Sequence, residues 1–363
     1  MSIVLMKHDT EQNSTHRARQ FGSSAPVRIG TREEFATVAQ LLREAEFNER
    51  TICEQFGLSD ISEVGRLINT RVDRADIASQ LSVLVRLFLA LTFVPGAEID
   101  RACDRQSIDS LLSLGLLRPD GPNFYSPVFL YPVDGFVIAS DRLTNIDGSS
   151  NASLPDIVFP AISRGTLQFL RLLPSIEGGE ILDLCAGTGI AAFALSRMNK
   201  RACSIDITRQ ASEYARFNKA LNGCDKVEVL QGDLYEPVKE RMFDCIVAHP
   251  PYVPSVNVDT FWRDGGAIGD TFIKRIVEEM PKHLRAGGYA LILAQGVDTR
   301  EATFEEGARR WLGQSAADFD IIFAGEKDRG PQRVLELLAR GSSADVIQRL
   351  GEAFDAAEVV NMP

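Results

Sequence analysis

Four short groups of polar, acidic and glycine residues follow one another between residues 183 and 252, each at or near the end of an apolar stretch. In chain order they are Asp183 with the turn glycines Gly187 and Gly189, then Asp206, then Gly232 and Asp233, then His249-Pro250-Pro251-Tyr252. Open α/β sheets bind ligands at the carboxyl ends of their strands. The sequence therefore predicts that these four groups meet at one site.

The glycine turn fits a phosphate-containing or nucleoside ligand. Gly187 and Gly189 let the backbone turn tightly and approach a ligand without a Cβ, and a helix beginning near Ile190 directs its first amides at that ligand. With Ala192 the motif also fits a dinucleotide fingerprint. Asp183 argues against that ligand, because an acid in the first strand is unfavourable beside a pyrophosphate. It suits the cationic amino acid part of S-adenosylmethionine.

Two further acids have roles in the same interpretation. Asp206 can accept hydrogen bonds from two ribose hydroxyls, and Asp233 from an adenine amino group. Taken singly, each is also explained as the N-cap of the following segment, and Asp183 as a turn-capping acid. Their register with the glycines favours a nucleoside cofactor. An NAD-dependent oxidoreductase is an alternative, although the chain offers no residue to act beside a nicotinamide.

The elements that must position these residues form an α/β pattern. Strands are expected at 180–186, 201–207, 227–232, 243–248, 289–295, 318–324 and 332–339, and helices at 190–198, 208–221, 269–285 and 302–314. This alternation predicts a doubly wound, Rossmann-like sheet of seven strands, mainly parallel. The last two strands follow each other without a helix, so they are expected to close the sheet as an antiparallel hairpin.

The N-terminal part is mainly helical. Thr31 and Glu34 form a capping-box signature, helices are expected at 77–91, 97–103 and 106–114, and a hairpin at 123–141. This order is typical of a winged-helix-like domain, which can bind nucleic acid, cover a substrate or form dimers. The presumed recognition helix carries Asp109 and no basic stripe, whereas a duplex reader normally shows clustered Lys and Arg. The second and third roles are therefore favoured.

Composition limits the class of protein. The 363 residues are 45% hydrophobic and carry a net charge of −11, which disfavours broad binding to phosphate backbones. None of the six cysteines forms a C-x-x-C pair, so no metal site is expected. No run approaches the roughly 18 apolar residues of a membrane span. We expect a cytoplasmic protein with residues 1–28 as a flexible lead-in, 29–143 as the helical domain, 144–156 as a linker and 157–363 as the ligand-binding domain.

Residues 159–340 resemble the class I S-adenosylmethionine-dependent methyltransferases, and within them the "methyltransferase small" group. That group includes release-factor glutamine methyltransferases and ribosomal RNA guanine and adenine N-methyltransferases. The resemblance implies that Asp183, Gly187 and Gly189 hold the methionine part of the cofactor, Asp206 the ribose and Asp233 the adenine. Further cofactor contacts are expected at Ala186, Ile207, Gly232, Leu234 and His249.

The acceptor site departs from the family signature, which is Asn-Pro-Pro-Tyr or Asp-Pro-Pro-Tyr. The prolines fix a rigid turn, and Tyr252 offers a ring face to a planar group or to the sulfonium. A neutral His249 can accept one hydrogen bond, and it can also act as a general base near its usual pKa of about 6.5. The base role favours an amine, hydroxyl or carboxylate acceptor over a glutamine amide or a nucleobase. Alternatively, His249 only packs the turn.

The catalytic residues are thus predicted to be His249, Pro250 and Tyr252. Substrate contacts are expected from Pro251, Tyr252, Trp262 and Arg263, and from Arg164, which lies in Ser-Arg-Gly-Thr near the position of a Pro-Arg-x-x-Thr element in the glutamine methyltransferases. The stretch 262–277 also resembles their Asp-Gly-rich turn.

The leading functional hypothesis is methyl transfer to a nitrogen, or an oxygen, of a small molecule or protein side chain. The alternatives are an RNA base N-methyltransferase, whose N-terminal domain docks RNA, and a non-catalytic S-adenosylmethionine-binding subunit. Neither a membrane nor a nucleic acid is an expected partner. The identity of the acceptor and a homodimeric state are left open.

Overall fold

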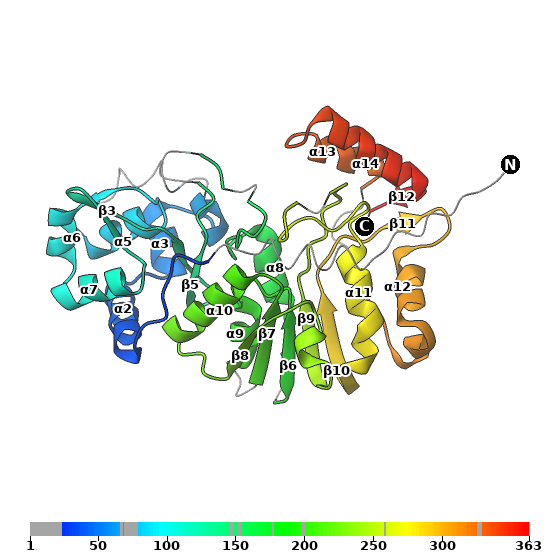
Figure 1. Cartoon of the computed structure of the whole chain (residues 1–363), viewed down its shortest axis with the longest axis horizontal. Coiled ribbons are helices and arrows are strands. Elements are labelled where there is room, and N and C mark those ends of the chain that lie inside the picture. The colour runs from blue at the N-terminus through cyan, green and yellow to red at the C-terminus, as the bar shows by residue number, and fades with distance from the viewer. Residues whose placement is uncertain are drawn as a thin grey trace.

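A computed structural model describes residues 24–65, 68, 79–144, 149–151, 154–175, 178–197, 201–257, 259–324 and 329–362. Figure 1 shows an N-terminal unit at the left, a sheet with its helices in the centre and lower right, and a pair of C-terminal helices at the upper right. Most of the expected lead-in and parts of the expected linker lie outside the described residues, so these two predictions stay untested.

The N-terminal unit consists of short helices whose caps follow from the sequence. The predicted capping box is confirmed, because Thr31 and Glu34 bond reciprocally at the start of α2. Side chains of Asn48, Ser79 and Asp104 cap three later helices by accepting from a backbone amide of the first turn, without the reciprocal bond. The helices are α2 (Arg32–Glu44), α3 (Glu49–Phe56), α5 (Gln80–Phe88), α6 (Gly96–Ala102) and α7 (Arg105–Ser113).

Two hairpins lie in and just before the segment 123–141, where one was expected. β2 (Arg118–Asp120) pairs antiparallel with β3 (Asn123–Tyr125), and β1 (Val94–Pro95) joins them in the order β1-β3-β2. β4 (Phe129–Val133) and β5 (Phe136–Ser140) form a separate antiparallel pair. The expected hairpin is confirmed by β4 and β5, but it begins at Phe129 rather than Asn123, since Ser126 Oγ accepts from Val128 N and donates to Val128 O between β3 and β4. The run from α5 to β3 supports a winged-helix-like assignment, which stays a prediction.

The second unit is built on a parallel sheet with the order β10-β9-β6-β7-β8. Its strands are β6 (Glu180–Leu184), β7 (Arg201–Asp206), β8 (Val227–Gln231), β9 (Phe243–Ala248) and β10 (Leu284–Ile292). The helices are α8 (Arg164–Leu172), α9 (Ile190–Ser196), α10 (Arg209–Leu221), α11 (Thr271–Glu279) and α12 (Phe304–Leu312). The first five strands and their following helices are therefore close to the predicted positions.

Successive residues of the strands point to opposite faces of the sheet and pack into two separate hydrophobic cores. Ile181 and Val247 belong to the core shared with α9 and α10, whereas Leu182 and Ile246 pack with α11 on the other face. Both faces are covered, as is typical of parallel sheets. The first core also extends into the N-terminal unit, where the ring of Phe35 meets that of Phe217 at 5.2 Å.

The sheet has five strands among the described residues, so the expectation of seven was wrong. Residues 332–339 were expected as a strand, yet α13 (Pro331–Leu338) occupies them, with proline at its first position. Val334, Leu335 and Leu338 pack in one apolar cluster with α14 (Ala344–Ala356), a helical spacing rather than an alternating one. The expected partner strand at 318–324 then lacks a ladder. A 3₁₀ helix, Gly313–Asp318, runs into irregular backbone there, and Ile322 is 91% exposed.

Candidate active site

A cavity of about 320 Å³ opens at the carboxyl ends of β6, β7 and β9, below the first turn of α8. Ten of the predicted site residues line it: Asp183, Ala186, Gly187, Asp206, His249, Pro250, Pro251, Tyr252, Trp262 and Arg263. Six other predicted site residues do not line this cavity: Gly189, Ile207, Gly232, Asp233, Leu234 and Arg164. The structure thus brings together three of the four groups that the sequence analysis predicted to meet.

The glycine turn has the backbone that its sequence predicts. Gly187 and Gly189 have φ values of +53° and +83°, a region that glycine adopts at little cost. A Cβ on Gly189 would lie 2.8 Å from the Phe193 ring, whereas one on Gly187 would meet nothing within 4 Å. Gly189 is therefore required for packing as well as for conformation, and Gly187 leaves open space on the turn.

Asp183 is buried beneath this turn. It is 1% exposed, and its Oδ2 accepts a hydrogen bond of 3.1 Å from the backbone amide of Ala192 in the first turn of α9. Burial raises the pKa of Asp183 to about 8, because a carboxylate loses hydration there, and the nearby charge of Asp206 adds to the effect. The carboxyl group is thus held for a cationic partner that would restore its charge.

Asp206 closes the same side of the cavity. Its Oδ2 accepts from Gly187 N at 2.9 Å, and its Oδ1 accepts from the amide and hydroxyl of Thr208. Burial raises the pKa of Asp206, while these hydrogen bonds oppose the rise. Three hydrogen bonds thus fix the side chain at the cavity wall, and Oδ2, which accepts one of them, keeps capacity to accept a second from a ligand hydroxyl.

Asp233 does not line the cavity and forms an ion pair instead, while its predicted contact with an adenine stays a prediction. Its Oδ2 accepts from the guanidinium of Arg275 on α11 at 2.9 Å, and the two side chains are 37% and 40% exposed. The adjacent Leu234 is buried in the core below, and a Cβ on Gly232 would clash with Pro237. The sequence offered no sign of this ion pair, because its partners are 42 residues apart.

His249 stands between two aromatic rings at the acceptor side. Its ring lies 5.3 Å from that of Phe169 and 5.8 Å from that of Tyr252. Burial lowers the pKa of His249 to about 4, because the charged imidazolium loses hydration. This lowered pKa disfavours a base that titrates near 6.5, and the role of His249 as a base stays a prediction. The imidazole is neutral at physiological pH, where it can accept one hydrogen bond and donate another.

The turn that carries Tyr252 is clamped by glycines from the next loop. A Cβ on Gly265 would lie 2.7 Å from Tyr252 Cα, and one on Gly269 would lie close to Tyr252 O. Val253 N donates to Arg263 O, and Gly265 N donates to Val253 O. This close approach of two backbones explains why the stretch 262–277 is rich in glycine and fixes the acceptor side of the cavity.

The remaining predicted substrate residues divide into two groups. Trp262 stacks on Phe159 with ring centres 4.2 Å apart, and Arg263 pairs with buried Asp264 at 3.2 Å. Both line the cavity. Arg164 is exposed at the start of α8, where its charge helps to lower the pKa of Asp60 after the larger effect of the Ser62 hydroxyl. The structure does not bring Arg164 into the site.

Several lining residues were missed in the sequence. Thr208 caps α10, so the rule that Ser or Thr precedes a helix could have marked it. Phe159 and Phe169 carried no signal that separates a cavity wall from ordinary core.

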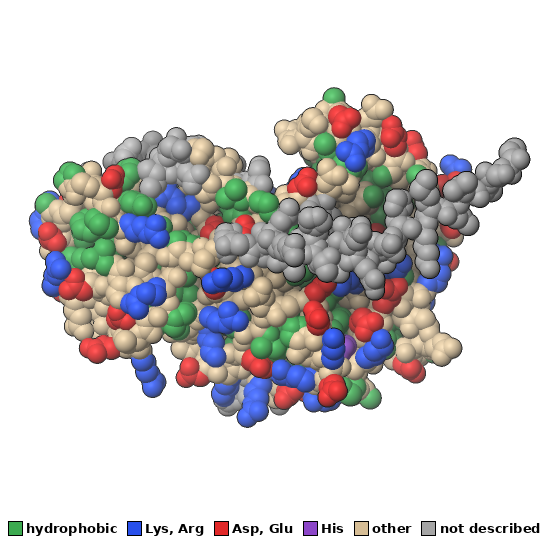
Figure 2. All heavy atoms as spheres, in the orientation of Figure 1, with side chains coloured by type: hydrophobic (Ala, Val, Ile, Leu, Met, Phe, Trp, Pro, Cys, Tyr) green, Lys and Arg blue, Asp and Glu red, His purple; other side chains and the backbone are tan. Residues whose placement is uncertain are grey.

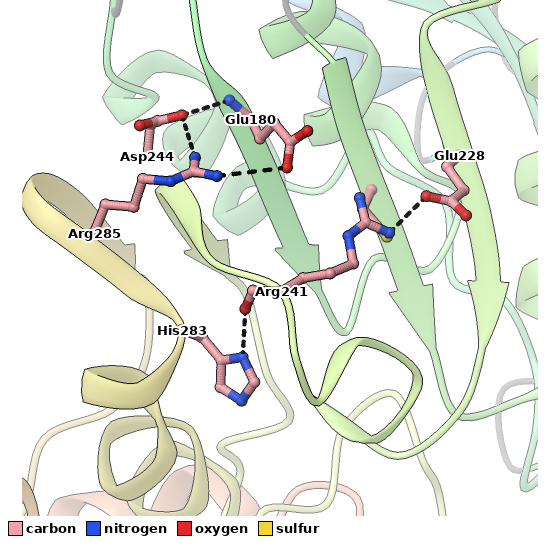
Figure 3. A network of polar contacts seen from close by, with 7 residues as sticks. Glu180, Glu228, Arg241, Asp244, His283 and Arg285 are labelled. Carbon is pink, nitrogen blue, oxygen red and sulfur yellow. Dashed lines mark hydrogen bonds and ion pairs between the residues drawn. The ribbon is translucent and has the colours of Figure 1, made fainter.

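His283 has a structural role at the other end of the strands. Its Nδ1 lies 2.9 Å from Arg241 O, and its ring stacks on Tyr235. In the same region Arg285 pairs with Asp244 and Glu180, and Arg241 pairs with Glu228 (Figure 3). Among the residues that the structure describes, His249 is therefore the histidine available for chemistry in the cavity.

Two negative findings concern the described residues alone. No helix among them is long and apolar enough to span a bilayer. No group of three or more His, Cys, Asp or Glu side chains in the described ranges is arranged to hold a metal ion.

Comparison with known proteins connects this site to a family. Residues 159–307 match the methyltransferase small domain. The chain is 35% identical over 138 residues to the release factor glutamine methyltransferase of Thermodesulfovibrio yellowstonii, covering 34% of this chain and 50% of that protein. It is 26% identical over 171 residues to a putative protein N5-glutamine methyltransferase of Methanocaldococcus jannaschii, covering 45% and 85%.

A third relative, the ribosomal protein uL3 glutamine methyltransferase of Bradyrhizobium diazoefficiens, is 28% identical over 163 residues, covering 41% of this chain and 51% of that protein. The chain thus spans about half the length of two of these three relatives. A solved structure of a putative methyltransferase from Bacillus halodurans has a TM-score of 0.34 at 16% identity, covering 54% of this chain and 92% of that one. Residues 159–307 are therefore similar to a methyltransferase small domain, and this segment holds Asp183, the glycine turn, Asp206 and the turn from His249 to Tyr252.

Proposed function

We propose that this protein transfers a methyl group from S-adenosylmethionine to a nitrogen of a neutral, planar group on a protein side chain, with a carboxamide as the first candidate. The observation that carries the proposal is the environment of His249, which lies half-buried beside two aromatic rings and stays neutral at physiological pH.

The cofactor side of the cavity fits S-adenosylmethionine. A glycine turn without side chains, the buried acid Asp183 and the hydroxyl-binding acid Asp206 line one wall. Asp183 suits a cationic amino group, since its carboxyl group has an amide donor but no cationic partner among its hydrogen bonds. When bound, the cofactor supplies an already activated methyl group, so positioning provides most of the catalysis.

The acceptor side fits a neutral nitrogen better than a charged amine. His249 can accept a hydrogen bond from an NH2 group, as the asparagine of the family signature does, and burial opposes its protonation. Tyr252, Phe159 and Trp262 offer flat apolar walls. The acidic residues that line the cavity, Asp183 and Asp206, lie on the cofactor side rather than beside His249, so a charged amine acceptor would lack a carboxylate partner. These features make a planar amide a candidate acceptor again, although the hypothesis of a general base had disfavoured it. Three relatives are named as glutamine methyltransferases, which supports the same candidate.

The described structure gives little support to RNA as the acceptor. On the face seen in Figure 2, basic and acidic side chains are interspersed rather than gathered into a basic groove. On α7 the one basic residue, Arg105, pairs with Asp109 at 2.9 Å. We propose that the N-terminal unit, winged-helix-like in its order of elements, supports the methyltransferase domain. The domain limits and a cytoplasmic location stay predictions.

The test is a transfer assay with S-adenosylmethionine labelled in its methyl group. The protein is incubated with a cell extract, the protein and RNA fractions are separated, and methylated residues are located by mass spectrometry, with His249→Ala as the control enzyme. Label on glutamine or asparagine amides supports the proposal. Label on lysine amines or carboxylates overturns the neutral-nitrogen assignment, and label in RNA favours the alternative acceptor. Cofactor binding without transfer in any fraction would favour a non-catalytic binding subunit.

A further inference from the structure

Two asparagines, Asn218 on α10 and Asn222 at its C-cap, hold the open edge of the β4–β5 hairpin. Val137 N donates to Asn222 Oδ1 at 2.9 Å, and Asn222 Nδ2 donates to Val137 O at 2.7 Å. One helical turn away, Ala139 N donates to Asn218 Oδ1 at 2.8 Å, and Asn218 Nδ2 donates to Ala139 O at 3.0 Å. The two side-chain amides thus take the place of a neighbouring strand along β5.

The two asparagines differ in their remaining hydrogen bond. Asn222 Nδ2 also donates to Asn218 O within its own helix. Asn218 Nδ2 instead donates, at 3.1 Å, to Thr188 O, the carbonyl between the two turn glycines. Asn218 is 0% exposed and Thr188 is 3% exposed, so water does not replace this bond.

The bond to Thr188 fixes the part of the turn with the greatest freedom. The peptide that joins Thr188 to Gly189 is held on both sides, because its carbonyl accepts from Asn218 and its amide, Gly189 N, donates to Ala186 O at 2.9 Å. A turn with two glycines has many accessible backbone conformations. Holding this peptide plane keeps the turn in one of them before a ligand arrives, which lowers the entropic cost of binding.

We propose that Asn218 is a positioning residue for the cofactor turn, through which the N-terminal unit raises the affinity of the site for S-adenosylmethionine. The proposal rests on the proposed function, since it takes S-adenosylmethionine as the ligand of the turn. Further contacts between the same hairpin and α9 agree with it. The ring of Phe136 packs against Phe193 at 6.0 Å, and Arg197 pairs with Asp134 at 3.0 Å.

Asn222 provides a matched control. Asn218→Ala and Asn222→Ala each remove two bonds to β5, and each is expected to lower the thermal midpoint by a similar amount. Asn218→Ala alone also frees Thr188 O. We expect this variant to bind S-adenosylmethionine about five- to ten-fold more weakly in calorimetric titration, the scale of one hydrogen bond of about 1–1.4 kcal/mol. For Asn222→Ala we expect less than a two-fold change.

Hydrogen exchange of the ligand-free full chain separates this inference from the proposed function. Exchange of the amides in residues 185–192 is expected to be faster in Asn218→Ala than in the wild type or in Asn222→Ala. Equal exchange and equal affinity in the two variants would overturn the positioning role. A wild type that does not bind S-adenosylmethionine would overturn the proposed function, and the exchange data would still decide whether Asn218 holds the turn. If an alanine variant does not fold, Asn218→Asp and Asn222→Asp can be compared in the same two assays. Each keeps the size of the side chain and its accepting oxygen but replaces the donating NH2 group with an oxygen.

Discussion

Binding of S-adenosylmethionine is expected to release a proton from Asp183. In the ligand-free protein, burial holds the pKa of this carboxyl at about 8, so it is largely protonated at pH 7. A cationic amino group beside it favours the charged form and lowers that pKa. The affinity must therefore rise with pH below about 8, because the state that binds the cation best is the one that has lost the proton.

The size of the effect follows from the pKa. A carboxyl with a pKa of about 8 is roughly 90% protonated at pH 7, so if it is fully ionised in the complex about 0.9 proton leaves on binding, and the dissociation constant falls about nine-fold from pH 6 to pH 7. The α-amino group of the ligand has a pKa of about 7.7–8.0, so it remains mostly charged across this window.

Calorimetric titration at several pH values, in buffers of different ionisation enthalpy, measures both quantities. Asp183→Asn keeps the size of the side chain and an oxygen for the Ala192 amide, but cannot ionise. This variant should show weaker binding with little dependence on pH, and any dependence that remains is assigned to Asp206. A wild-type dissociation constant that stays within two-fold between pH 6 and pH 7, without proton release, would refute the reasoning.

Four further predictions concern the acceptor side, the turn and stability. His249→Asn should retain most of the methyl transfer rate, whereas His249→Ala should lose about 10²-fold or more, and the affinity for the cofactor should be unchanged in both variants. Because burial holds the pKa of His249 at about 4, the wild-type rate should not rise with pH through 6.5. Such a rise would restore the role of His249 as a general base. Gly189→Ala should abolish cofactor binding and lower the thermal midpoint, since the added Cβ would lie 2.8 Å from a carbon of the Phe193 ring. Gly187→Ala has free space for its Cβ and should lower the free energy of unfolding by about 1–2 kcal/mol through its positive φ alone. Similar losses in the two variants would contradict the packing argument. Gly265→Ala should impair transfer far more than Gly287→Ala, because the added Cβ would lie 2.7 Å from Tyr252 Cα at Gly265 but meets no atom within 4 Å at Gly287, even though of the two only Gly287 has a positive φ; equal activity in rate assays would remove the proposed clamp on the acceptor turn. Asp183→Asn should raise the thermal midpoint of the ligand-free protein at pH 7. Folding raises the pKa of Asp183 from 3.8 to about 8, so the wild-type protein loses stability as the pH rises between these two values. A wild-type midpoint that stays unchanged from pH 5 to pH 8 would speak against the raised pKa.

Local patterns were enough for much of the fold. The apolar strands before Asp183 and Asp206 and the glycine turn between them form as predicted, because strand, turn and cap preferences depend on neighbours in the chain. The same is true of the capping box at Thr31. The pattern Val334, Leu335, Leu338 was misinterpreted as a strand, although its spacing and Pro331 fit a helix, and that error also produced the expected partner strand at 318–324.

The sequence by itself indicated the type of ligand and ten of the residues that line its cavity, since the identity of an acid, a glycine or a proline is already a chemical fact. The tertiary structure decided how those groups behave. It paired Asp233 with Arg275, joined the cofactor turn to the N-terminal unit through Asn218, and placed His249 where it stays neutral. These outcomes depend on segments that are distant in sequence and on the loss of hydration at burial, and neither can be derived from local spacing.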